Sequence, residues 1–255
     1  MEVHVEIAGQ KYSADLHRAL DLSISIRKGG VKAWYVEDPD MEPVRYDSFI
    51  GSVSEGGKVN FRAIRFNPHG HGTHTECLGH ITPEVHSVNR LLGAWFFTAR
   101  LVTITPILQD SDRIITRDQV LSLIDGTAPD ALIIRTLPND RAKQSTVYSA
   151  TNFPYIAVEA MEELVSWGIR HLLIDLPSVD REEDGGLLAA HRAFWREHSG
   201  RMDCTITELI YAPDEILDGW YLLNLQVAPL ENDASPSRPV IFPLHRLQDA
   251  VGKEK

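Results

Sequence analysis

The sequence predicts an α/β fold with a mixed sheet and flanking helices. Short apolar segments that suit buried strands recur along the chain, and segments with helical spacing of apolar residues separate several of them. The C-terminal part adds more strand than a purely parallel, doubly wound sheet would need. The chain of 255 residues shows neither an internal repeat nor a low-complexity linker. We therefore expect one domain that spans residues 1–255.

Several segments should form strands because they are rich in β-branched, aliphatic or aromatic residues. They are residues 21–26, 95–107, 131–136, 171–177, 221–230 and 239–244. Other segments should form helices, and they are residues 116–125, 156–168 and 187–197. The first of these opens with Thr116 three residues before Gln119, which is a capping-box pattern. Residues 28–57, rich in Gly, Pro and Asp, predict a loop with little regular structure.

Charge and hydrophobicity argue against several classes of function. The formal net charge is -11, so no basic excess is present to neutralise the phosphates of a nucleic acid. No apolar run reaches the roughly 18–20 residues that a membrane span needs. The first residues lack the basic and apolar regions of a signal peptide, and two cysteines do not make a disulfide framework. We expect a cytoplasmic protein with a small-molecule partner, and neither a nucleic-acid nor a membrane partner.

Residues 67–86 gather many side chains that can bind metal, in the sequence NPHGHGTHTECLGHITPEVH. Five of the 11 histidines lie here, together with Glu76, Cys77 and Glu84. Such a density is not expected by accident in a surface loop, and imidazole is a common protein metal ligand. Cys77 could bind zinc as a thiolate, although a cysteine in such a place is more often a small buried apolar residue. The stretch therefore predicts a metal site.

One arrangement within this stretch is typical of cupins. His69 and His71, followed by Glu76, match a His-x-His-x(4)-Glu element, which would hold one iron or manganese ion in an oxygenase. The second half of the cupin pattern does not follow, and the expected helices fit a small β-barrel poorly. The cupin stays an alternative hypothesis.

A second arrangement is carried by the run from His71 to Glu76 and by His80 after it. It resembles the signature His-x-Gly-Thr-His-x-Asp-x-Pro-x-His of the cyclase family of metal-dependent hydrolases, which includes bacterial kynurenine formamidase and isatin hydrolase. Further similar segments lie in order along the chain, with DLSISI before the signature and ALIIRT, LLIDLPSVD, the segment with His191, TELIYAPDEI and SPSRPVIFPL after it. The resemblance implies a single-domain fold of the swivelling β/β/α type and a homo-oligomer, either a dimer or a tetramer.

The resemblance also implies a role for individual residues. The metal ligands would be His69, His74, Glu76, His191 and Glu208, and they would hold two divalent ions, zinc or manganese. The spacing of the family leaves His69 and His71 as rivals for the first ligand, and His69 is preferred because the glycines beside it can absorb an extra residue. Glu76 stands where the family has aspartate, so the spacing of the metals can differ.

The implied reaction is hydrolysis of an amide C–N bond, in an aryl formamide such as N-formylkynurenine or in a cyclic amide. A bound metal ion activates water as hydroxide in such enzymes. His80, the last histidine of the signature, would act as the catalytic acid and base. Trp34 is expected to line the substrate pocket. A relative that binds metal or ligand without turnover stays a second alternative.

Overall fold

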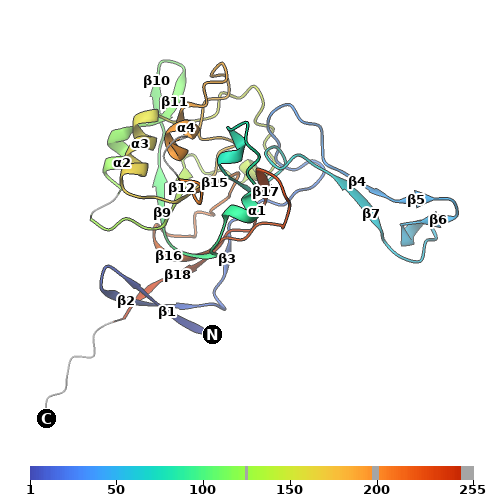
Figure 1. Ribbon diagram of the computed structural model, residues 1–255, viewed down its shortest axis with the longest axis horizontal. Coiled ribbons are helices and arrows are strands. Elements are labelled where there is room, and N and C mark those ends of the chain that lie inside the picture. The colour runs from blue at the N-terminus through green and yellow to red at the C-terminus, as the bar shows by residue number, and fades with distance from the viewer. Residues whose placement is uncertain (124–125, 197–200, 248–255) are drawn as a thin grey trace, which may run out of the picture.

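The computed structural model describes residues 1–123, 126–196 and 201–247 (Figure 1). Within these ranges the largest sheet has nine strands, and helices lie against it, which confirms the predicted α/β fold. In spatial order its strands are β17 (Ala234–Pro236), β8 (His74–Glu76), β15 (Thr205–Glu208), β14 (His171–Ile174), β12 (Ala131–Thr136), β9 (Phe96–Ile104), β16 (Gly219–Asn224), β18 (Val240–Pro243) and β3 (Leu20–Asp21).

The centre of this sheet is parallel and its two sides are antiparallel. Strands β15, β14, β12 and β9 run parallel to one another, whereas β8, β17, β16, β18 and β3 pair antiparallel with their neighbours. Along β12, Leu132 and Ile134 enter the core on one face, and Ala131 and Ile133 enter the core on the other. Burial on both faces explains why this strand is a nearly continuous apolar run.

Three helices cover one face of the sheet (Figure 1). They are α2 (Arg117–Leu121), α3 (Val158–Ser166) and α4 (Ala189–Trp195), while the short α1 (Val88–Leu91) lies elsewhere. The capping box between Thr116 and Gln119 is confirmed, because both of its hydrogen bonds are present. Buried Leu164 of α3 and Phe194 of α4 belong to one core cluster with the sheet. The predicted helices are therefore confirmed, although residues 124–125 and 197 lie outside the described residues.

Two small sheets and several short turns complete the body. An N-terminal hairpin, which the sequence analysis did not assign, pairs with a strand from the far end of the chain. Its strands are β1 (Glu2–Ile7), β2 (Gln10–Asp15) and β19 (His245–Arg246). The other small sheet contains β10 (Ile107–Gln109), β11 (Asp112–Ile115) and β13 (Tyr155–Ile156). The 3₁₀ helices are η1 (Val53–Glu55), η2 (Leu78–His80) and η3 (Arg141–Gln144).

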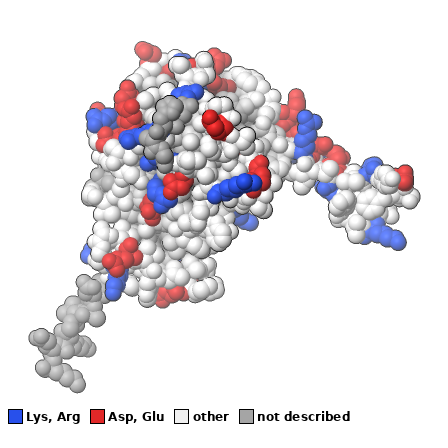
Figure 2. Space-filling view, viewed as in Figure 1, with Lys and Arg blue, Asp and Glu red and all other residues white. Residues whose placement is uncertain are grey.

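The prediction of an irregular loop for residues 28–57 is confirmed for residues 28–39 and is wrong from residue 40 onward. Residues 40–65 form an arm that projects from the body, with charges of both signs on its surface (Figures 1 and 2). Its strands are β4 (Asp40–Pro43), β5 (Arg45–Tyr46), β6 (Phe49–Ile50) and β7 (Arg62–Arg65). Strand β4 pairs with β7, which lies beyond the segment considered, so local composition gave no sign of the pairing.

Two predicted strands are shorter than expected. In residues 21–26 only the beginning pairs as a strand, and Ser23 adds an isolated bridge to Ile210. The backbone N–H of Ile24 instead donates to the hydroxyl of Thr73, in the histidine-rich segment. The segment 221–230 leaves the ladder after Asn224. In the part of the chain that the structure describes, no helix is long and apolar enough to span a bilayer.

Candidate metal centre

Two neighbouring strands place three of the predicted ligands on one face of the sheet. His74 and Glu76 alternate along β8 and therefore point to the same side. Glu208 at the end of β15 pairs directly with His74 across the ladder. Thr75 and Thr207 point the other way, where their hydroxyls lie 2.8 Å apart. The pleat of two strands thus brings one imidazole and two carboxylates together.

The Gly-Thr-His sequence holds His74 in place through backbone contacts. Gly72 has φ of +136°, and a Cβ there would lie 2.9 Å from the carbonyl oxygen of Ile24, so only glycine suits the position. The hydroxyl of Thr73 donates to the carbonyl of Leu209, which ties the loop to the end of β15. His74 Nδ1 lies 3.0 Å from the Gly72 carbonyl oxygen, which leaves Nε2 facing Glu208 Oε2 at 3.4 Å.

Helix α4 brings His191 to the same place. Asp180 caps this helix, because its carboxylate accepts the backbone N–H groups of Ala190 at 2.7 Å and of His191 at 3.1 Å. The same carboxylate lies 2.6 Å from His191 Nδ1. The other ring nitrogen, Nε2, lies 3.1 Å from Glu76 Oε1 and 3.8 Å from Glu208 Oε1. The sequence analysis did not identify Asp180 as a site residue. The only signal in the sequence was its position at the end of the segment LLIDLPSVD.

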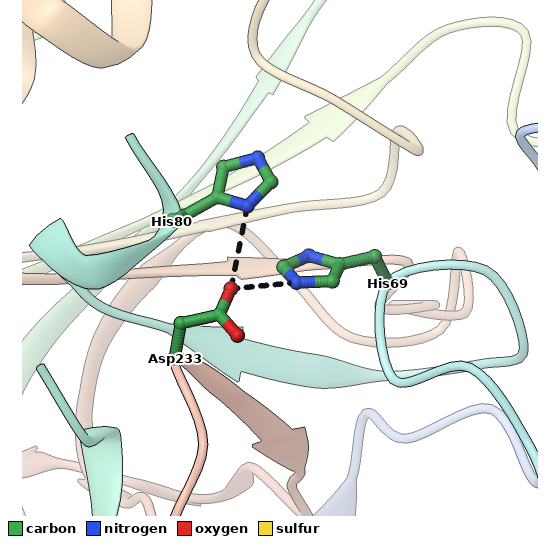
Figure 3. Close-up of side chains that lie close together, drawn as sticks. All are labelled: His69, His80 and Asp233. Atoms are coloured by element: carbon green, nitrogen blue, oxygen red, sulfur yellow. Dashed lines mark hydrogen bonds and ion pairs between the residues drawn. The ribbon is translucent and has the colours of Figure 1, made fainter. Parts of the chain in front are cut away.

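Two further histidines and an aspartate close the site on its outer side (Figure 3). His69 Nδ1 lies 3.1 Å from Glu76 Oε2, and His69 Nε2 lies 2.9 Å from Asp233 Oδ2. His80 Nδ1 lies 3.4 Å from the same Asp233 oxygen, and His80 Nε2 lies 3.9 Å from Glu76 Oε2. Asp233, which the sequence analysis also missed, directly precedes β17, whose Ala234 pairs with Glu76.

The cluster has a buried part, the floor, and a partly exposed part, the mouth. The floor contains His74, Glu76, His191 and Glu208, and the mouth contains His69, His80 and Asp233. His74 and Glu76 are fully buried, and the side chains of His191 and Glu208 are nearly so. On the outer side, the exposed fractions are 20% for the side chain of His69, 29% for that of His80 and 26% for that of Asp233. A small molecule can therefore approach His80 and not the buried floor.

The electrostatics of the cluster couple its imidazoles to its carboxylates. Burial disfavours the charged form of His69 and His191, but neighbouring carboxylates that accept their N–H groups outweigh it and raise the pKa of each histidine to about 10. For His69 these are Asp233 and Glu76, and for His191 they are Asp180 and Glu76. Burial of Glu76 is likewise outweighed by the surrounding imidazoles, which hold its pKa well below the ordinary value. A cation bound here would replace the protons that the imidazoles carry on the nitrogens facing Glu76.

The residues present fit a bound metal ion. His74 Nε2 and Glu76 Oε2 are buried and have no hydrogen-bond partner, which is costly unless a ligand satisfies them. Both belong to a group of three possible ligand atoms with His69, and a second such group contains Glu76, His80 and His191. Imidazole and carboxylate together suit zinc and manganese. Each histidine of the floor also has its outer nitrogen held by an oxygen, as is usual for metal-binding histidines.

The other candidates lie apart from this cluster. His71 Nδ1 accepts the N–H of Asn67 at 2.8 Å and His71 Nε2 lies 2.6 Å from the Glu37 carbonyl oxygen, so both of its nitrogens are occupied. Cys77 is buried, and burial raises the pKa of its thiol to about 11. Among the described residues Cys77 belongs to no group of possible metal ligands, which agrees with the prediction of a small buried residue.

Trp34 lies at the edge of a separate apolar cluster. Its ring meets Phe153 edge to face, with the centroids 5.9 Å apart. The cluster also includes Leu209, the residue that follows the predicted ligand Glu208. The substrate-binding role of Trp34 stays a prediction.

Comparison with known proteins gives consistent matches. Residues 20–181, more than half of the chain, match the family model described as putative cyclase. The kynurenine formamidase of Bacillus cytotoxicus is 27% identical over 192 residues, which cover 74% of this chain and 83% of that protein.

The parallel central strands and the helices exclude the cupin alternative, whose fold is a small antiparallel barrel.

Solved structures show the same fold. A predicted metal-dependent hydrolase from Bacillus stearothermophilus superposes with a TM-score of 0.61 at 18% identity, covering 88% of this chain and 97% of that one. Isatin hydrolase A from Labrenzia aggregata, bound to benzyl benzoate, superposes with a TM-score of 0.65 at 14% identity, covering 88% and 93%.

Proposed function

The chain belongs to the cyclase family, and from this premise we propose that it is a metal-dependent hydrolase that cleaves an amide C–N bond. The observation that carries the proposal is the convergence of two imidazoles, those of His69 and His80, on one buried oxygen of Glu76. Relatives named kynurenine formamidase and isatin hydrolase suggest two substrate classes. These are an aryl formamide, such as N-formylkynurenine, and a cyclic amide, such as isatin.

We assign His69, His74, Glu76, His191 and Glu208 as ligands of two divalent ions, zinc or manganese. The way in which both carboxylates divide their oxygens supports two ions. One oxygen of Glu76 faces His69 while the other faces His191, each at 3.1 Å. One oxygen of Glu208 faces His74 at 3.4 Å, and its other oxygen faces His191 at 3.8 Å. Glu76 and Glu208 would each offer both oxygens to bound cations, which would supply Lewis acidity at the site.

The chain's own residues would carry the proton transfers. Divalent ions in this site would supply Lewis acidity, which lowers the pKa of a water molecule and stabilises the oxyanion of the attacked amide. His80 accepts the proton of the attacking water through Nε2, the nitrogen that faces Glu76, and returns it to the leaving nitrogen. Its partial exposure leaves an edge of the ring open to substrate. The buried carboxylates of Glu76 and Glu208 would stabilise positive charge gathered beside them.

Trp34 is proposed to line the substrate pocket. Its half-buried indole lies on an apolar cluster that extends to Leu209, next to the candidate ligand Glu208. A flat aromatic ring in the substrate would gain apolar contact there. Replacing Trp34 with alanine should raise KM more than it lowers kcat, as expected for contacts made equally in the ground and transition states.

The proposed oligomer, a dimer or a tetramer, is supported by the projecting arm. The arm exposes large apolar side chains, which include Tyr46, Phe49, Val53, Val59, Phe61 and Ile64. Exposed apolar clusters of this kind often mark protein contacts. Light scattering on eluted protein should give a mass above that of one chain, and Phe61→Ser should lower it. A monomeric wild type would contradict the proposal.

The decisive experiment compares the metal-free and the reloaded protein on two substrates. N-formylkynurenine is tested for release of formate, and isatin for ring opening. Turnover of either one should disappear after chelation and return when zinc or manganese is added. Metal binding with no turnover of any amide in a wider panel would favour the non-catalytic alternative.

A further inference from the structure

His69 and His80 each lie beside the same two carboxylates, those of Asp233 and Glu76. Their ring centroids lie 4.4 Å apart. One nitrogen of each ring faces the same oxygen of Asp233, at 2.9 Å for His69 and 3.4 Å for His80. The remaining nitrogen of each ring faces the same oxygen of Glu76, at 3.1 Å and 3.9 Å. The two imidazoles thus lie between an outer and an inner carboxylate, and Figure 3 shows both rings beside the outer one, Asp233.

A neutral imidazole has one N–H donor and one lone pair, so the group that accepts the N–H decides where the lone pair points. A carboxylate oxygen can accept two N–H groups, and Asp233 Oδ2 is within reach of both rings. If each ring donates outward to Asp233, one lone pair of each ring faces the inner space beside Glu76 Oε2, where a cation or a proton donor can meet it. The inward position is where His69 would bind a cation and where His80 would receive a proton.

We propose that Asp233 is a positioning residue, which fixes the tautomers of His69 and His80 so that His69 presents Nδ1 and His80 presents Nε2 to the reaction site. The effect of these tautomers on catalysis rests on the proposed amide hydrolase function. The assignment of the tautomers themselves does not depend on that function. Asp233 completes a pattern in the cluster. The Gly72 carbonyl holds the outer nitrogen of His74, and Asp180 holds that of His191.

The place of Asp233 in the fold suits this task. Its carbonyl oxygen accepts the backbone N–H of Cys77 at 3.0 Å, so its main chain is fixed to the strand that carries Glu76. This backbone contact does not involve the carboxylate and should survive a change of side chain. The carboxylate lies at the mouth, where water would otherwise compete for the outer nitrogens of both rings.

The test observes the rings directly. Zinc-loaded protein with ¹⁵N-labelled histidine is examined by NMR, with His69→Ala and His80→Ala spectra used to assign the signals. In the wild type, His80 should carry its proton on Nδ1 and His69 on Nε2. In Asp233→Ala, His80 should redistribute its proton to Nε2. Asp233→Asn keeps an acceptor oxygen and should retain most of the wild-type pattern. An unchanged His80 tautomer in Asp233→Ala would overturn the proposal, because zinc alone can hold the tautomer of His69.

Kinetics and metal content supply the second measurement. Asp233→Ala should lower kcat about 10- to 100-fold, the usual effect of losing a partner of a site histidine, with little change in KM. Asp233→Asn should recover part of this loss. Glu84→Gln is the matched control, because it removes the same charge from an exposed position after His80 and should leave the rings and kcat unchanged.

The outcomes separate this proposal from the proposed function. If the wild type cleaves no amide, the ring spectra still decide whether Asp233 sets the tautomers. If Asp233→Asn loses one equivalent of zinc at saturating zinc, Asp233 is a ligand and the positioning role is wrong. If Asp233→Ala keeps its full metal content and the proton of His80 moves to Nε2, the positioning role is supported.

Discussion

His74 and Glu208 lie directly opposite each other on the antiparallel strands β8 and β15, with His74 Nε2 3.4 Å from Glu208 Oε2. They are 134 positions apart in the sequence. Their pairing places a buried imidazole nitrogen that has no hydrogen-bond partner beside a buried carboxylate. Leaving that nitrogen unsatisfied is costly, which favours a cation between the two side chains.

Glu208→Gln should therefore weaken metal binding while the fold is kept. Glutamine has nearly the same shape but no charge, and it can still accept the N–H of Val179, which Glu208 Oε1 accepts at 3.1 Å. Affinity for zinc should fall by at least about 10- to 100-fold, the range seen even for partners of metal ligands. Competition with a chromogenic chelator measures it. Glu215→Gln, at an exposed carboxylate, is the control, and equal affinities in the two variants would contradict the assignment.

His69→Ala should reduce metal affinity more than His71→Ala does. His69 faces Glu76, whereas both ring nitrogens of His71 are engaged by Asn67 and by the Glu37 carbonyl. His71→Ala should instead lower thermal stability, because it removes hydrogen bonds that hold the base of the arm. Calorimetric titration and thermal unfolding of both variants give the comparison. A greater loss of zinc affinity in His71→Ala would reverse the assignment.

Zinc affinity should rise steeply with pH. In the metal-free protein the pKa values of His69 and His191 are raised to about 10 from 6.5, so both carry a proton at neutral pH. For each proton that zinc must displace, the affinity should rise about tenfold with every pH unit, as long as the pH stays below that pKa. Titrations at several pH values, with proton release followed in weak buffer, measure this. Affinity independent of pH would mean that these imidazoles are already neutral.

The same shifts predict how the stability of the metal-free protein depends on pH. A folded pKa above the unfolded value of 6.5 means that the protonated histidines stabilise the fold fully below pH 6.5. This contribution is lost as pH rises through about 10. Chemical unfolding of the metal-free protein should therefore become easier over this range. His69→Ala should show a shallower dependence, and an unchanged slope would exclude His69 as a source.

The sequence predicts the central strands well, for a physical reason. Parallel strands such as β12 are buried on both faces, so they appear as continuous apolar runs. The histidine-rich stretch is conspicuous because five of the 11 histidines lie within 20 residues. The ligand roles of its members stay predictions, but the structure brings His69, His74, Glu76 and His80 together with His191.

Other features depend on contacts that local sequence does not contain. Asp233 reaches His69 across 164 positions, and in a loop it looks like any solvated aspartate. Asp180 is similar, since its role appears only when α4 places His191 above it. The arm was missed because β4 pairs with a strand beyond the segment considered. In residues 21–26, the backbone binds Thr73 in preference to continuing a strand.

His80 differs from the other histidines of the cluster in its distance from the floor. Its Nε2 lies 3.9 Å from Glu76 Oε2, whereas His69 and His191 each approach Glu76 to 3.1 Å. It is also the most exposed of the cluster histidines described here. Gly79 before it is required by packing, since a Cβ there would lie 2.5 Å from the His86 carbonyl oxygen. The position suits proton transfer better than ligation.

His80→Ala should accordingly keep both fold and metal while losing most turnover. The buried ligands remain when the ring is removed, but no group is left at the mouth to move a proton from water to the leaving nitrogen. A general acid–base residue contributes about two to four decades in rate, so kcat should fall by that amount with little change in KM. Steady-state kinetics and metal analysis are made on the same preparation, with His86→Ala as the control from the same loop. Loss of metal from His80→Ala would make His80 a ligand, and near-full activity with metal retained would exclude the acid–base role.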